Sequence, residues 1–138
     1  MEGTYQHTID SKGRLFIPVR LREELGHVFY VTLSMEKCLS AYSRESWERF
    51  NEKYRQMSQA NQNKMKILYA MASRCEPDSQ GRINLSQQLR DFAGLKKNVA
   101  IVGVGDRVEL WDSERYAGVA AEAMTPENIA AVLKELNF

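Results

Sequence analysis

Alternation of apolar and polar residues predicts a β-strand near the start of the chain, over residues 4–9. The next four residues, Asp10-Ser11-Lys12-Gly13, are typical of a tight turn, because Asp accepts backbone hydrogen bonds and Gly tolerates a positive φ. The alternation resumes over residues 14–17, so we predict a hairpin. Pro18 and Gly26 then mark the two ends of a short helix.

A second hairpin and a longer helix follow. Residues 28–33 and 38–42 favour a pair of strands. Ser43 is placed to cap a helix, and Tyr42 and Trp47 flank that cap as a hydrophobic staple. The residues that recur at helical spacing beyond the cap are mostly aromatic: Trp47, Phe50, Tyr54 and Met57.

Two further helices are predicted from apolar stripes. The first joins the two halves of the chain and carries Met65, Leu68, Ala72 and Cys75. The second begins at Thr125-Pro126, an N-cap followed by proline, and carries Ile129, Val132, Leu133 and Leu136. We expect these stripes to pack in the core or against neighbouring helices.

The chain contains an internal repeat at an offset of 68 residues. Asp10-Ser11-Lys12-Gly13-Arg14 recurs as Asp78-Ser79-Gln80-Gly81-Arg82, and seven of the 17 positions from 10 to 26 are identical in the second copy. We therefore predict two copies of one small unit, over residues 1–69 and 70–138. Units of this size bury little core alone, so we expect them to pack together as one compact domain.

The composition is that of a globular protein, with 138 residues, of which 43% are hydrophobic and 27% charged. No apolar run reaches the roughly 18–20 residues of a membrane helix, and residues 1–6 do not resemble a secretory signal. We therefore expect a cytoplasmic protein with no membrane partner. The net charge is +1, and that total alone argues against a nucleic-acid partner.

Candidate catalytic and metal-binding groups are sparse. Cys38 and Cys75 lie outside any Cys-x-x-Cys or Cys/His pattern, which predicts two buried thiols and no structural zinc. His7 and His27 are isolated from other candidate groups. No Gly-rich phosphate loop or hydrolase motif occurs, so we predict a protein that is not an enzyme and has no cofactor, metal or small-molecule substrate.

The distribution of charge reverses the conclusion drawn from the net charge. Residues 1–69 carry 11 basic and 8 acidic side chains, whereas residues 70–138 carry 8 basic and 10 acidic ones. Between positions 12 and 22 there is no acid, and the basic residues there are Lys12, Arg14, Arg20 and Arg22. Two of these four are replaced in the second copy, by Gln80 and Gln88. The first copy therefore presents a basic patch suited to phosphates, and its arginines can contact guanine through two hydrogen bonds.

Arg14 and Arg82 each have a structural alternative to a DNA contact. Both copies keep Asp-Ser-x-Gly-Arg, so an Asp–Arg pair across the turn would give either arginine a structural role. We favour a DNA contact for Arg14 and a structural role for Arg82. Lys12 has no equivalent structural role, which favours a DNA contact for this residue too.

Together these residues resemble the MraZ family. The likeness covers nearly the whole chain and is carried by the segment from Asp10 to Arg22, its second copy at Asp78 to Arg82, and the segment from Gly103 to Arg107-Val108-Glu109-Leu110-Trp111. The resemblance implies an α+β fold in which two tandem AbrB-like swapped-hairpin units form one pseudo-two-fold β-barrel with flanking helices. The unit at 1–69 would be the DNA-binding copy and the unit at 70–138 the scaffold copy.

The resemblance also implies a function. The protein would be a nucleoid-associated transcriptional regulator, mainly a repressor, of the division and cell-wall gene cluster. It would bind direct repeats in its own promoter on double-stranded DNA, as a ring homo-oligomer of about eight copies. The implied DNA-contacting loop is Ser11, Lys12, Gly13 and Arg14, with Arg14 central. Arg22 matches a basic helix position of AbrB-type units, and Arg20 joins it from the basic patch.

Three positions depart from the family pattern, namely Glu23, Arg74 and Ser86, and two other functions stay open. One is an antitoxin-like AbrB module that binds DNA and also inhibits a partner protein. Such modules usually end in a disordered tail, whereas this chain has a second folded copy there, which counts against that function. The other is an assembly protein whose ring recruits partners without DNA.

Overall fold

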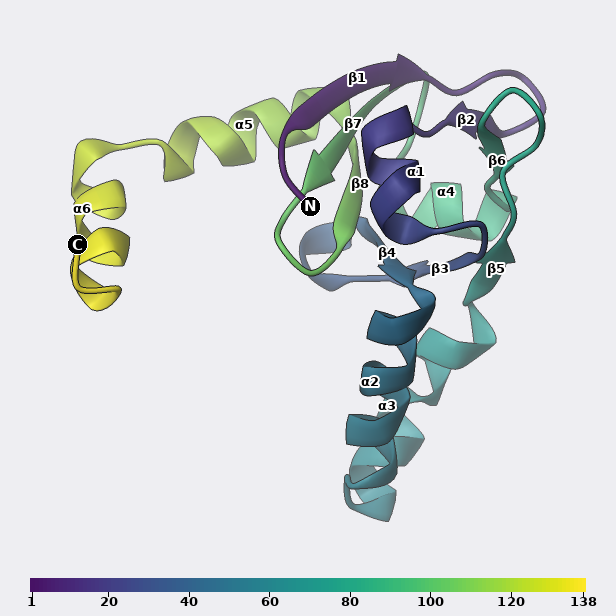
Figure 1. Cartoon of the computed structure of the whole chain (residues 1–138), viewed down its shortest axis with the longest axis horizontal. Helices are drawn as coiled ribbons and strands as arrows, with labels where there is room; N and C mark the ends of the chain where they lie inside the picture. Colours follow the sequence, from purple (N-terminus) through teal and green to yellow (C-terminus); the bar gives the residue numbers. More distant parts are fainter.

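The computed structural model describes all residues of the chain, 1–138, as an α+β protein with six α-helices and antiparallel strands (Figure 1). One short 3-10 helix, η1, joins two of the strands. The elements in chain order are β1 (Thr4–Thr8), β2 (Arg14–Phe16), α1 (Val19–Leu25), β3 (Phe29–Leu33), η1 (Met35–Lys37), β4 (Leu39–Ser43), α2 (Arg44–Arg55), α3 (Gln59–Ala70), β5 (Ser73–Cys75), β6 (Arg82–Asn84), α4 (Gln87–Ala93), β7 (Asn98–Gly103), β8 (Val108–Asp112), α5 (Ser113–Ala123) and α6 (Pro126–Glu135).

Six strands form one antiparallel sheet in the order β1-β7-β8-β4-β3-β5. The two halves of the chain interleave in it, since β1 pairs with β7, β4 with β8, and β3 with β5. A separate two-stranded ribbon pairs β2 with β6, again one strand from each half. The outer strands β1 and β5 do not pair with each other, so the sheet is open and the expected closed barrel is not confirmed.

The hairpin predicted from residues 4–9 and 14–17 is wrong in its pairing. A single bridge, between Ile9 and Leu15, joins the two segments. Beyond it the strands separate, because β1 pairs along β7 over five positions while β2 pairs with β6. A strand added to a large sheet is better stabilised than one in an isolated two-stranded hairpin, which favours this exchange. The hairpin predicted from 28–33 and 38–42 is confirmed as β3 and β4.

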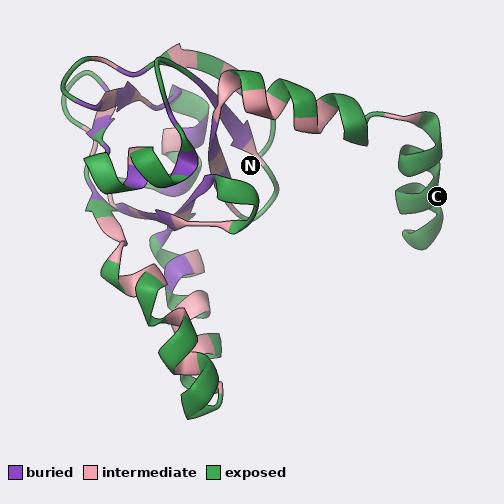
Figure 2. Cartoon of the chain, turned by 180° about the vertical axis from the view of Figure 1, so that it is seen from behind, coloured by how far each residue is buried: buried purple, intermediate pink, exposed green.

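One hydrophobic core serves both halves of the chain. It is a cluster of 19 buried residues that includes Leu21 and Leu25 of α1 and Leu89 and Ala93 of α4. Figure 2 shows these buried segments gathered in the body of the molecule. Each fully buried aliphatic side chain contributes roughly 1.5–3 kcal/mol, so the shared cluster stabilises the two halves together.

The predicted N-caps of α2 and α6 are confirmed, whereas the predicted end of the joining helix is not. Ser43 Oγ accepts a hydrogen bond from the Ser46 N–H at 3.2 Å and so caps α2. Thr125 Oγ1 caps α6 in the same way. The predicted joining helix ends earlier than its apolar stripe, because Cys75 lies in β5, paired with Phe29 of β3.

Two helical arms extend from the body (Figure 1). One is the antiparallel pair α2 and α3, and the other is α5 followed by α6. The apolar stripe of α6 lies outside the core of the chain: Ile129, Val132, Leu133 and the C-cap residue Leu136 are 44–59% exposed, and α6 carries no buried residue. No helix in the chain is both long enough and apolar enough to span a membrane.

Candidate nucleic-acid interface

The first turn is organised by the carboxylate of Asp10. Its Oδ1 accepts hydrogen bonds from the backbone N–H groups of Lys12 and Arg14, both at 2.9 Å. Its Oδ2 accepts one from Arg14 Nε at 2.7 Å. The Gly13 N–H donates to the Asp10 carbonyl oxygen at 3.0 Å, and Gly13 has a φ of 82°, which favours glycine. The turn and the Asp–Arg pair are therefore present as the motif predicts.

Arg14 is held through Nε alone. No hydrogen bond within the chain uses its Nη1 or Nη2, and 34% of the side chain is exposed. Ser11 and Lys12 are exposed beside it at the tip of the turn. The turn therefore exposes the Arg14 guanidinium in a fixed direction, beside the ammonium group of Lys12 on its flexible stem.

The second turn repeats this geometry around Asp78. Its Oδ1 accepts from the N–H groups of Gln80 and Arg82 at 2.9 Å, and its Oδ2 accepts from Arg82 Nε at 3.0 Å. Gly81 has a φ of 79°. Since Arg14 and Arg82 are pinned in the same way, the turn geometry does not distinguish the two roles predicted for them. The turns differ at the tip, where Gln80 stands in place of a lysine.

Both aspartates are held in their ionised form. The backbone N–H of Arg14 is the largest cause, and with the Arg14 side chain and the Lys12 N–H it lowers the pKa of Asp10 from 3.8 to about 2, against partial desolvation. The backbone N–H of Arg82 likewise leads the groups that lower the pKa of Asp78. Each arginine therefore faces a charged partner at every pH near neutrality.

The β2–β6 ribbon brings both arginines to one face. Leu15 and Ile83 pair at its centre and are buried in the core. Because side chains alternate along a strand, the residues on either side of this pair point outward. That outward face carries Arg14, Phe16, Arg82 and Asn84. A two-stranded ribbon fits the major groove of B-DNA, which makes this face the candidate interface.

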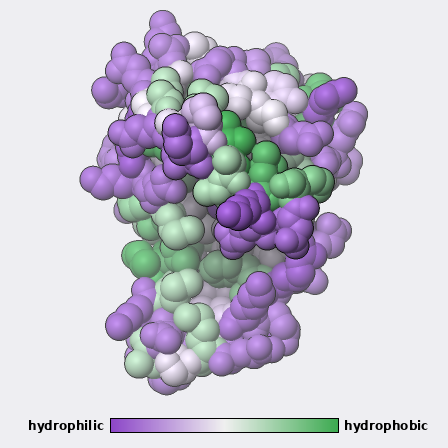
Figure 3. All heavy atoms as spheres, turned by 90° about the vertical axis from the view of Figure 1, so that its left-hand side faces the viewer, coloured by the Kyte–Doolittle hydropathy of each residue, from purple (hydrophilic) through white to green (hydrophobic).

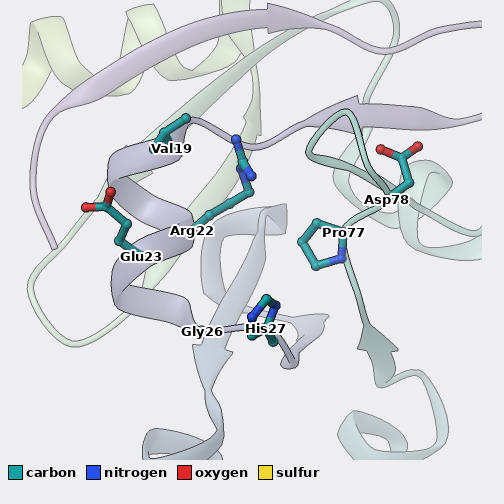
Figure 4. Close-up of a pocket in the computed structure, with 7 residues that line it drawn as sticks. All are labelled: Val19, Arg22, Glu23, Gly26, His27, Pro77 and Asp78. Carbon is teal, nitrogen blue, oxygen red and sulfur yellow. The ribbon is translucent and has the colours of Figure 1, made fainter.

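Arg22 has an intramolecular role in the structure. Its Nε donates to the Ile17 carbonyl oxygen at 2.7 Å, and its guanidinium lies 5.4 Å from the centre of the Phe16 ring. Figure 4 shows the side chain reaching from α1 toward the loop that carries Asp78, at one side of a polar pocket. The chain therefore places Arg22 against the second turn, while a phosphate contact for it stays a prediction.

Arg20 lies on the exposed side of α1. It lines a surface recess together with Glu2, Glu23 and Glu24. These carboxylates reduce the positive potential around it. A phosphate contact by Arg20 also stays a prediction, since the recess does not bring it together with the first turn.

Both cysteines are free and buried, as the sequence predicts. Burial raises the pKa of the Cys38 thiol to about 12, and it also raises that of Cys75. Each therefore stays a neutral thiol at neutral pH, unsuited to nucleophilic chemistry.

The sequence did not place Arg82 and Asn84 on one face with Arg14: a structural role is favoured there for Arg82, and Asn84 is not considered. Their place depends on the pairing of β2 with β6, which joins segments 68 residues apart. The available signal was the repeat itself, since two copies of one turn followed by one short strand suggest a symmetric pair. The fold and this interface together define a duplicated α+β protein that presents two Asp–Arg turns on one strand ribbon.

Comparison with known proteins agrees with this description. The family model described as "MraZ protein, putative antitoxin-like" matches the chain twice, over residues 1–69 and 68–135. A "Transcriptional regulator MraZ" of Carboxydothermus hydrogenoformans is 45% identical over 117 residues, covering 83% of this chain and 82% of the relative. One of Acetivibrio thermocellus is 41% identical over 140 residues, covering 99% and 98%. The chain belongs to the MraZ family.

Proposed function

We propose that the protein is a DNA-binding transcriptional regulator and that the turn from Ser11 to Arg14 is its main DNA contact. The observation that carries the proposal is the state of Arg14, which is fixed through Nε to Asp10 while both Nη groups remain available. A guanidinium presented in this way matches the two acceptors of guanine in the major groove. The names of the relatives, each a transcriptional regulator, support the same function.

The contacts divide into those that position the protein and those that select sequence. Lys12 is a point charge on a flexible stem and suits a phosphate. Arg14 reaches a base edge. Arg20 and Arg22 remain candidate phosphate contacts, with Arg22 the weaker candidate because its guanidinium packs against Phe16 and Gly81. The outward position of Arg82 adds it to the proposed interface.

The finer parts of the proposal follow from the family resemblance. They are recognition of direct repeats in the protein's own promoter, a mainly repressive role at the division and cell-wall gene cluster, and association with the nucleoid in the cytoplasm. The exchange of strands between the units at 1–69 and 70–138 supports the proposed swapped-hairpin arrangement and its behaviour as one domain. The proposal includes no enzymatic step.

Self-association into a ring is part of the same proposal, with a second copy of this chain covering α6. The exposed residues Ile129, Val132 and Leu133 of α6 form one helical stripe with Leu136 at its C-cap. Figure 3, which views the side toward which this arm points, shows hydrophobic atoms gathered among hydrophilic ones. Residues 113–138 carry four glutamates against two basic side chains, whereas α3 carries two lysines and no acid, so the arm and α3 of another copy are complementary in charge. An assembly that carries several weak DNA-binding turns binds repeated sites with increased avidity.

The test is binding of a promoter fragment with direct repeats, measured by fluorescence anisotropy at several salt concentrations. Arg14→Ala is compared with Arg55→Ala, a surface arginine on α2 that is paired with Glu52. We expect strong salt dependence, a large loss of affinity for the first variant and none for the second. Binding that ignores salt, or that survives Arg14→Ala unchanged, contradicts the proposal. Regulation that persists in the Lys12→Ala and Arg14→Ala double variant would favour the assembly protein instead.

A further inference from the structure

The turn of each half is built against a strand of the other half. The Gly13 carbonyl oxygen accepts a hydrogen bond from the Leu85 N–H at 2.9 Å, and the Gly81 carbonyl oxygen accepts one from the Ile17 N–H at 2.9 Å. The turn that carries Lys12 therefore depends for its position on residues of the second half. Its own aspartate fixes its internal shape, whereas the partner half fixes its place.

Arg90 of α4 lies directly behind the first turn. Its Nε donates to the Leu85 carbonyl oxygen at 3.0 Å. A Cβ placed on Gly13 would lie 3.0 Å from Cζ and Nη2 of Arg90, and 2.9 Å from the Leu85 carbonyl oxygen. The Arg90 guanidinium thus fills the space beside the Gly13 Cα. It is itself held in place by its hydrogen bond to the Leu85 carbonyl oxygen.

Arg22 occupies the equivalent place behind the second turn. Its Nε bonds the Ile17 carbonyl oxygen at 2.7 Å, and a Cβ on Gly81 would lie 2.7 Å from Arg22 Cζ. In both halves the bond reaches back five residues, from the first helix of the unit to the residue that precedes its N-cap. Arg22 and Arg90 are identical at the repeat offset, although the flanking basic residues at 12 and 20 become glutamine. This symmetric contact accounts for an arginine in both copies.

We propose that Arg90 is a positioning residue for the DNA-binding turn, and that Arg22 positions the second turn in the same way. The proposal rests on the function proposed above for the first turn. Arg90 limits the movement of Gly13 and thereby fixes where Lys12 and Arg14 point, without touching DNA itself. Arginine suits this role because a planar guanidinium packs flat on glycine while its Nε bonds a carbonyl, and lysine offers neither property.

The first test needs no DNA. Amide hydrogen exchange is measured across the chain for Arg90→Gln and for the matched variant Arg22→Gln. We expect Arg90→Gln to increase exchange at Lys12, Gly13 and Arg14, with the turn at 80–82 unchanged, and Arg22→Gln to give the opposite pattern. Increased exchange in both turns alike, or in the turn of the mutated half, overturns the proposal. Should either glutamine variant fail to fold, the lysine variants provide the same comparison.

The second test separates positioning from a direct phosphate contact. We expect Arg90→Gln to weaken binding of the direct-repeat promoter fragment about tenfold, because a loosened turn no longer holds Arg14 in place for its charged hydrogen bonds to DNA. The slope of log affinity against log salt should stay unchanged. A slope reduced by about 0.9 would mean a lost phosphate contact and would overturn the proposal, as would unchanged affinity. If the native chain binds no DNA, the proposed function fails. The hydrogen-exchange measurement still tests whether Arg90 and Arg22 each position the turn of the other half.

Discussion

Arg14 and Arg82 lie diagonally across the β2–β6 ribbon, and each is pinned by the aspartate of its own turn, at 2.7 and 3.0 Å. In the register of the ribbon Arg14 faces Asn84 while Arg82 faces Phe16. Diagonal positions of this kind are about 7–8 Å apart, so two guanidinium groups point outward within one short surface. The second turn is therefore positioned to contribute to the proposed interface, although its sequence alone suggests a scaffold.

Loss of either arginine should weaken DNA binding, and Arg14 should matter more. Arg14→Ala removes the proposed base contact, for which about 1–3 kcal/mol of discrimination is typical. Arg82→Ala should cause a smaller loss, because the neutral Gln80 beside it gives that turn less attraction for phosphate. Anisotropy with the direct-repeat fragment measures both, with Arg55→Ala as the control. Equal losses of affinity would mean that the two turns contribute equally to DNA binding. Unchanged affinity in Arg82→Ala would mean that Arg82 has only a structural role.

Exchange of the residues at the tips of the turns should change the salt dependence. Lys12→Gln gives the first turn the side chain of the second, and should lower the slope of log affinity against log salt by about 0.9 for the one lost phosphate contact. Gln80→Lys performs the reverse exchange and should raise it by about the same amount if the second turn reaches the backbone. Neither variant touches the hydrogen bonds of Asp10 or Asp78 to the backbone. An unchanged slope for Lys12→Gln would exclude a phosphate contact by Lys12.

Stability should fall in acid because of the two turn aspartates. The pKa of Asp10 is about 2 in the folded chain and 3.8 without these contacts, so the unfolded state binds more protons between these values. The stabilisation is therefore complete above about pH 4 and is lost as the pH falls toward about 2. Thermal unfolding measured from pH 5 to pH 2 should show a flatter profile for Asp10→Asn than for the native chain. Asp106→Asn, on an exposed loop, serves as the control, and parallel profiles for Asp10→Asn and the native chain would contradict the prediction.

Local features of this fold could be predicted from sequence, because the groups that form them are close in the chain. The Asp10 turn is closed by residues within four positions, and the Ser43 and Thr125 caps act within three. Strand pairing is different, because alternation of apolar and polar residues indicates a strand but not the strand it pairs with. The β1 strand could pair with its neighbour β2 or with the distant β7, and it pairs with β7. The sequence pattern therefore predicted the turn correctly and the hairpin incorrectly.

The same limit applies to the candidate site. Four basic residues between positions 12 and 22 indicate a patch, and the structure keeps Lys12 and Arg14 together in one exposed turn. Arg22 instead packs against Gly81, a residue 59 positions away that no local pattern could have paired with it. Charge can be read from sequence, whereas the surface that a charged side chain faces depends on the tertiary fold.

The α6 helix provides a last prediction, since its apolar stripe has no partner within the chain. Leu133→Asp places a charge in the centre of the stripe, and Ala131→Asp places the same charge on the opposite face of the helix. Burial of an unpaired carboxylate in an interface is costly, so Leu133→Asp should shift the protein toward smaller assemblies while Ala131→Asp leaves them unchanged. Native mass spectrometry measures the distribution of assemblies, and circular dichroism checks that both variants keep their helices. Binding to several repeats at once requires several copies in one assembly. Leu133→Asp should therefore also reduce affinity for a fragment with several repeats more than for one with a single repeat. Unchanged assembly in Leu133→Asp would exclude this face of α6 as a contact between copies.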